Sequence, residues 1–190
     1  MLFGIEKDVA DEVRAWSKHS LEKSNPNFNN LSACPYARKA WQEDKVGFVF
    51  KYDGHKQDLY TAMSCFDGTK DLVIVVDFAP EEDPDDFQEY LDLMNDAIAQ
   101  GAFIQKDLWL MGFHPMDESN DAIDEGSFEA TVEEPYALIF IQRLSKLQQS
   151  ADKLKEKGYY QAYSDDFNVS ELYSKREDFY RRLEHGNEAP

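Results

Sequence analysis

Leu72-Val73-Ile74-Val75-Val76-Asp77-Phe78 is the stretch that decides the fold. A nearly continuous run of Val and Ile of this length is typical of a strand buried on both faces or lying in the centre of a sheet. A helix is predicted next, over 84–100, because Asp83 is a natural N-cap, Pro84 suits the first helical position and Gly101 can end the helix. The stretch therefore predicts a central strand joined to an amphipathic helix.

Further strands and helices are predicted on both sides of this unit. The patterns predict strands over 46–52, 107–113 and 136–141, and helices over 7–23, from 34–35 onward, and over 57–66, 144–157 and 170–183. Strands interleaved with helices indicate an α/β (α+β) fold, a two-layer sandwich with a four-stranded mixed sheet and helices mainly on one face. We expect residues 1–157 to form a single α/β domain and residues 158–190 a C-terminal helical extension packing on it.

The composition favours one water-soluble domain in a reducing compartment. Hydrophobic residues make up 42% of the 190 residues, which is enough for a core. No apolar run approaches the roughly 18 residues of a membrane span, and the N-terminus does not have the pattern of a secretory signal. Two cysteines are too few for a disulfide framework. We therefore expect a cytoplasmic protein that does not enter a membrane.

The acidity of the chain is concentrated in one region. Residues 71–142 contain 19 Asp and Glu and one Lys, so they carry the whole net charge of −18, and the rest of the chain is neutral. An acidic surface disfavours direct nucleic-acid binding, which needs cationic groups against phosphates. The charge has several interpretations: solubility or a salty milieu, a cation site, a basic partner protein, or mimicry of a nucleic acid.

Cys34 is a candidate nucleophile. Pro35 is well accepted at the first position of a helix, so we expect Cys34 at a helix N-terminus, where free backbone N–H groups stabilise a thiolate. Arg38 and Lys39 lie one turn later and would add to this effect. The alternative is a buried, inert thiol, which is also the expectation for Cys65.

His114 is a candidate base or metal ligand. It follows a predicted strand, at a position where α/β sheets commonly bind ligands. A metal site would combine it with Asp117 and Asp121, although no zinc-type spacing supports such a site. The alternative is a histidine that bonds the loop backbone. The sequence contains no phosphate-binding loop, dinucleotide fingerprint or esterase motif, and it identifies no cofactor.

Three short motifs carry a resemblance. They are Ala33-Cys34-Pro35-Tyr36-Ala37, Phe113-His114-Pro115 and Glu134-Pro135-Tyr136-Ala137. They resemble, in order and approximate separation, the Leu-Cys-Pro-Phe-Ala, Phe-His-Pro and Ser-Pro-Tyr-Pro motifs of an uncharacterised bacterial family of similar length. The resemblance implies an α/β fold and highlights Cys34, His114 and Tyr136, but it implies no reaction. Glu133 stands where the family commonly has an Arg, so an anion-binding role of that Arg is not carried over.

Two functional hypotheses follow. In the first, Cys34, His114 and Tyr136 converge on a pocket at the strand ends that binds or transforms a small molecule, with Cys34 and His114 as a thiol and its base. In the second, the protein is not an enzyme and binds a basic partner through the acidic residues 71–142.

Overall fold

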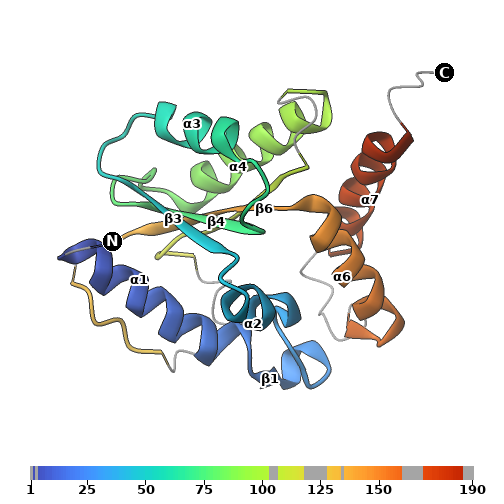
Figure 1. Cartoon of the computed structure of the whole chain (residues 1–190), viewed down its shortest axis with the longest axis horizontal. Coiled ribbons are helices and arrows are strands. Elements are labelled where there is room, and N and C mark those ends of the chain that lie inside the picture. Colours follow the sequence, from blue (N-terminus) through green and yellow to red (C-terminus); the bar gives the residue numbers. More distant parts are fainter. Residues whose placement is uncertain are drawn as a thin grey trace.

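β4 (Leu72–Asp77) is an inner strand of the main sheet (Figure 1). The computed structural model describes residues 2, 4–102, 107–117, 128–133, 135–159 and 169–185, and only the backbone of residues 27, 35, 169–172 and 182–185. The elements along the chain are α1 (Ile5–Trp16), the π-helix η1 (Ser17–Leu21), β1 (Ser24–Asn25), the 3-10 helix η2 (Pro26–Phe28), β2 (Leu31–Ser32), α2 (Pro35–Gln42), β3 (Val46–Lys51), α3 (Gln57–Cys65), β4 (Leu72–Asp77), α4 (Pro84–Ala99), β5 (Trp109–Phe113), β6 (Ala137–Gln142), α6 (Leu144–Glu156) and α7 (Val169–His185).

The main sheet has the strand order β3-β4-β6-β5. β3 and β4 run parallel, and β6 is antiparallel to both of its neighbours, β4 and β5. The carboxyl ends of β3, β4 and β5 consequently lie at the same end of the sheet, measured along the strands, as the start of β6. The predicted α+β class and four-stranded mixed sheet are confirmed, and the predicted strands agree with the observed ones to within two residues.

Helices cover both faces of this sheet, whereas the sequence had predicted helices mainly on one face. Val75 and Ile139 pack in the cluster that includes α3 and α4. Ile74, Val76 and Phe140 pack on the opposite face, in the cluster that includes α1 and α2 (Figure 1). The cause is that β4 and β6 are apolar on both faces, so each face needs its own cover. The arrangement therefore has three layers in place of the expected two.

The N-terminal region also departs from the expected pattern. The helix predicted over 7–23 is α-helical only as far as Trp16 and continues as the π-helix η1. The turn-rich stretch after it contains β1 and β2, which form a two-stranded antiparallel sheet. Glu22, which follows η1, is buried and accepts hydrogen bonds from Arg14 and from the Ser17 hydroxyl at 3.1 Å. These polar contacts join the residue after η1 to the last turn of α1 and to the first residue of η1.

A buried asparagine completes the hydrogen bonding of the edge strand β5. Asn95 on α4 accepts a bond from the Leu110 amide at 2.9 Å and donates one to the Leu110 carbonyl at 3.0 Å. The side chain thus takes the place of a neighbouring strand at this position. It satisfies backbone groups that an edge strand would otherwise leave open.

The C-terminal helix α7 packs beside α6. The Tyr173 hydroxyl donates to Asp152 at 2.6 Å, and Phe179 contacts Trp109 of β5 with ring centres 6.4 Å apart. These contacts join α7 to the cluster on the α4 side of the sheet. The division at residue 157 into domain and extension stays a prediction. Among the described helices, none has both the length and the apolar character needed to cross a bilayer.

Gly112 allows α4 to approach β5 closely. A Cβ atom on Gly112 would lie 2.5 Å from Phe87 Cε1 and closer still to Leu91 Cδ1. Both neighbours belong to the core, so neither can move at small cost. We expect Gly112→Ala to lower the free energy of unfolding by about 1–3 kcal/mol in urea denaturation. Gly47→Ala is the matched control, because a Cβ there has only ordinary contacts at 3.5 and 3.6 Å. Equal stabilities of the two variants would contradict this account.

Candidate functional site

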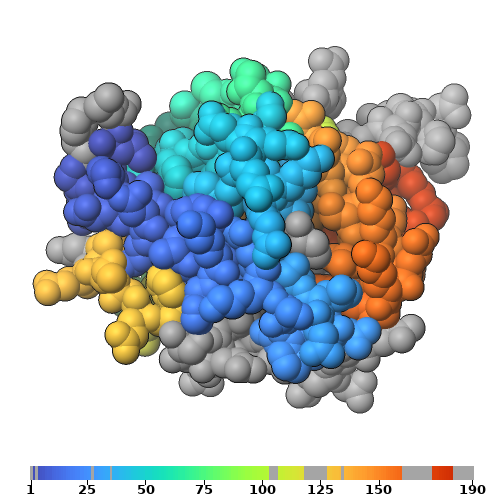
Figure 2. Space-filling view, turned by 60° about the horizontal axis from the view of Figure 1, so that its bottom comes forward, coloured from blue at the N-terminus to red at the C-terminus, as the bar shows by residue number. Residues whose placement is uncertain are grey.

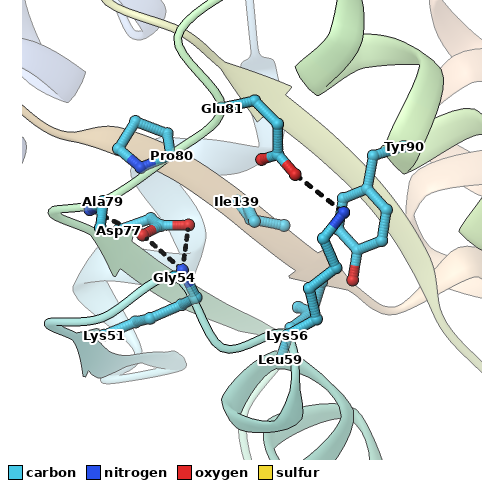
Figure 3. A pocket seen from close by; sticks show the side chains of 10 residues that line it. All are labelled: Lys51, Gly54, Lys56, Leu59, Asp77, Ala79, Pro80, Glu81, Tyr90 and Ile139. Carbon is cyan, nitrogen blue, oxygen red and sulfur yellow. Dashed lines mark hydrogen bonds and ion pairs between the residues drawn. The ribbon is translucent and has the colours of Figure 1, made fainter.

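A cavity of about 210 Å³ lies at the carboxyl ends of the parallel strands β3 and β4 (Figure 3). The start of α3, the turn after β4 and a tyrosine of α4 complete its wall. The residues that line it are Lys51, Gly54, Lys56, Leu59, Asp77, Ala79, Pro80, Glu81, Tyr90 and Ile139. The carboxyl ends of adjacent parallel strands are the common place for ligands in α/β sheets.

Lys51 and Asp77 form a buried ion pair on one side of the cavity. The two residues are register partners at the ends of β3 and β4. Lys51 Nζ lies 2.8 and 2.9 Å from the two carboxylate oxygens, and the side chains are 5% and 4% exposed. The Ala79 amide donates a further bond to Asp77 Oδ1 at 3.0 Å. Breaking a pair that is this well shielded would leave an uncompensated buried charge.

A second ion pair, Lys56 with Glu81, lies across the cavity (Figure 3). Their N···O distance is 2.8 Å, and Lys56 Nζ lies 3.8 Å from the centre of the Tyr90 ring. Partial burial would raise the pKa of Glu81, but the bond from Lys56, the backbone amide of Glu81 and the positive charges of Lys56 and Lys51 together leave the pKa lowered. Glu81 is therefore ionised at neutral pH.

The Tyr90 hydroxyl is a third polar group at the cavity. Its oxygen is buried and has no hydrogen bond of normal geometry to the described part of the chain. Burial, and then the neighbouring Tyr60, raise the pKa of Tyr90. The phenol thus keeps its proton and can donate it to a ligand.

His114 lies next to this cavity but serves the loop backbone. Its Nε2 lies 2.9 Å from the Glu81 carbonyl, and its Nδ1 accepts a bond from the Met116 amide at 3.2 Å. These partners assign a neutral ring with its proton on Nε2. Neither ring nitrogen is left to act as a base or metal ligand, so this geometry does not support the predicted role.

The predicted metal site is not supported by the described residues. Asp121 lies outside them, so its part in the prediction is not tested. Asp117 is described, and its amide donates to the His114 carbonyl at 3.1 Å. Within the part of the chain that the structure describes, no group of three or more His, Cys, Asp or Glu side chains could hold a metal ion.

Tyr136 lies near the same edge of the sheet but on the other face. It packs in the α1 cluster, and its hydroxyl donates to Glu12 of α1. Glu12 also accepts bonds from the Thr131 amide, from the Thr131 hydroxyl at 2.7 Å and from the Val132 amide at 2.7 Å. Figure 2 shows the segment 128–133 lying against α1, where these bonds hold it. Tyr136 is therefore part of a structural contact and does not face the cavity.

Cys34 lies at the opposite edge of the sheet. It caps α2, whose Tyr36 neighbours Asp71 and Arg143, the residues just outside β4 and β6 at that edge. The two edges are five residue steps apart in the register, about 17 Å. Burial, opposed by the amides of Ala37 and Tyr36 and assisted by Glu22, raises the pKa of the thiol. The structure therefore does not bring Cys34 and His114 together, and the raised pKa does not support an activated thiolate.

Cys65 is exposed, which corrects its expected place in the core. Leu59, Met63 and Phe66 follow one another at spacings of four and three residues and take the buried face of α3. Cys65 is two residues from Met63, so the helical period turns it to the opposite side.

The sequence contains a signal for the cavity residues at the ends of two predicted strands. Lys51 and Asp77 are charged residues that each end an otherwise apolar strand. A charge at the carboxyl end of a buried strand is a candidate for a ligand site, and opposite charges at two such ends indicate a pair.

No protein-family model, curated protein or solved structure matches this chain. The three short motifs described above therefore remain a resemblance.

The Glu12 contact gives a prediction that depends on pH. Burial would raise the pKa of Glu12, but its bonds to Tyr136, Thr131 and Val132 outweigh it and leave the pKa lowered. A lowered pKa adds stability above about pH 4.3, the value of a free Glu, and this stability is lost as the pH falls through the folded pKa. Glu12→Gln places an amide N–H₂ against donors, so we expect it to cost about 1–3 kcal/mol at pH 7.

Urea denaturation at several pH values measures this effect. The difference between the wild type and Glu12→Gln should shrink below pH 4.3, where Glu12 of the unfolded chain becomes protonated. Asp11→Asn is the control on the same helix, because its pair with Lys7 is exposed and worth little. A difference that does not change with pH would refute the role of the charged form.

Proposed function

We propose that the protein binds a small molecule in the cavity at the ends of β3 and β4. One observation supports this proposal above the others: a buried ion pair, Lys51 with Asp77, lines an open cavity of about 210 Å³. Buried charges cost free energy, and an apolar pair of similar volume is often at least as stable. A charged pair at a cavity is therefore better explained by ligand recognition than by stability.

The proposal keeps the strand-end location of the first hypothesis and replaces its residues. The cavity places Lys51, Asp77, Lys56, Glu81 and Tyr90 where Cys34, His114 and Tyr136 had been expected. The described thiols are not joined in a disulfide, which supports the further proposal of a reducing, cytoplasmic setting.

Blocking the cavity tests this function. A Cβ atom on Gly54 meets nothing within 4 Å, so Gly54→Phe can place a ring at the cavity without displacing the backbone. In ligand-observed NMR with a set of small polar molecules, we expect the wild type to give binders and Gly54→Phe to weaken them at least about tenfold, as steric exclusion predicts.

His55→Phe is the matched control, because His55 is exposed, adjacent in sequence and outside the lining residues. It should bind the same molecules as the wild type. A set in which every binder is retained by Gly54→Phe would show that the cavity is not the binding site.

An interaction with a basic partner is a second candidate function. Its support is the outer side of α4 and the turn before it, where the exposed carboxylates are those of Glu82, Asp83, Asp85, Asp86, Glu89 and Asp92. Leu93, which is 61% exposed, lies among them. We propose this surface as the part of residues 71–142 that would attract a basic protein, including one that binds nucleic acid.

Two variants that lose the same number of negative charges at different places test this surface. One variant changes Asp85, Asp86, Glu89 and Asp92 to their amides, and the control changes the exposed Asp11, Glu43, Asp44 and Asp58. Each variant loses four negative charges. We expect the α4 variant to bind an oligolysine peptide at least about fivefold more weakly than the control at low salt. Equal affinities of the two variants for oligolysine would show that the peptide responds to the total charge and not to the surface on α4.

A further inference from the structure

We infer that the cavity is built for a small monocarboxylate with a short apolar chain. This inference rests on the proposed function and adds the chemical class of the ligand. It is carried by the hydrogen-bonding groups that the protein leaves available and by the apolar surface between them.

Lys51 supplies a buried donor. An ammonium group has three N–H bonds, and the two oxygens of Asp77 are its only partners among the described residues. At least one N–H is therefore available although the side chain is only 5% exposed. A buried donor is costly unless a ligand or water accepts its bond.

The other groups at the cavity add further donors. The Tyr90 hydroxyl is protonated and has no hydrogen bond of normal geometry to a described residue. Lys56 retains N–H bonds beyond the one it gives to Glu81. α3 begins at Gln57 with no side-chain cap, so its positive end lies at the same wall. The buried groups that still need a partner are therefore donors, because both oxygens of Asp77 already accept bonds and Glu81, which accepts one from Lys56, is 29% exposed.

The buried N–H of Lys51 and the buried Tyr90 hydroxyl favour a ligand whose polar group accepts hydrogen bonds. A carboxylate has two oxygens and about four acceptor sites, which suits two or three converging donors. The negative charge of the whole chain, −18, opposes a multiply charged anion such as phosphate. The protein therefore favours a single carboxylate over a phosphate group.

The rest of the ligand is apolar and short. Ile139 lies between the two ion pairs in Figure 3, and Leu59, Ala79 and Pro80 add further apolar lining. At about 30 Å³ for each water-sized group, the volume of about 210 Å³ holds roughly seven non-hydrogen atoms. A carboxylate with three or four further carbon atoms has this size.

Sodium butyrate is the probe, compared with n-butanol, n-butylamine and inorganic phosphate at constant ionic strength. Titrations followed by amide chemical shifts give the dissociation constants. We expect butyrate to bind at least about tenfold more tightly than each of the other three, as a charge-assisted bond requires. Tyr90→Phe should weaken butyrate about three- to tenfold and leave butanol nearly unchanged.

The ion pair is tested without leaving a buried charge alone. The double variant Lys51→Met/Asp77→Leu removes both charges together, so it avoids the unpaired carboxylate of a single substitution. It should lose at least about tenfold in butyrate affinity and become unselective between butyrate and butanol. If this variant does not fold, Tyr90→Phe decides the question alone.

The outcomes separate the ligand class from the proposed function. Butylamine, butanol or phosphate binding as tightly as butyrate, or butyrate unaffected by the variants that fold, would overturn the carboxylate class. If Gly54→Phe still removes the binders found, the cavity remains a binding site for another ligand. If no molecule is lost in Gly54→Phe, both the class and the proposed function are overturned.

Discussion

The burial of β4 on both faces is the constraint on which the rest of the structure depends. Each fully buried Val or Ile side chain contributes roughly 1.5–3 kcal/mol relative to exposure, and β4 provides such residues to both core clusters. Helices on both faces are needed to shield them (Figure 1). With both faces covered, the strand ends are the parts of the sheet that polar side chains and a ligand can reach. The location of the cavity is thus a consequence of how the central strand is buried.

The Lys51–Asp77 pair has a different status from the apolar contacts around it. Its two charges occupy equivalent positions at the ends of adjacent strands, where apolar residues would continue the pattern of the core. Desolvation offsets much of the attraction between such charges. The pair therefore adds little to stability but fixes a charged group beside the cavity. Asn95 contrasts with it, because both polar groups of its amide are used on the backbone of β5.

Local patterns were sufficient to predict the elements, and they failed for the relations between elements. Asp83, Pro84 and Gly101 marked the ends of α4 closely. Whether Cys34, His114 and Tyr136 converge depends on the end of the strands and the face of the sheet at which each side chain lies. Strand register sets both, and it joins residues far apart in sequence, such as Asp77 and Ala137. The apolar character of β4 did contain the information that helices would be needed on both faces.

The unequal burial of the two cysteines has a practical consequence. The thiol of Cys34 is only partly exposed and has a raised pKa, whereas Cys65 is exposed at the end of α3. A thiol-reactive fluorophore would consequently react preferentially at Cys65 in the native chain. That position lies on the helix that also contributes Leu59 to the cavity, six residues and about 9 Å away along the helix axis. The natural sequence thus carries a preferred attachment point for a fluorophore that would report on occupancy of the cavity.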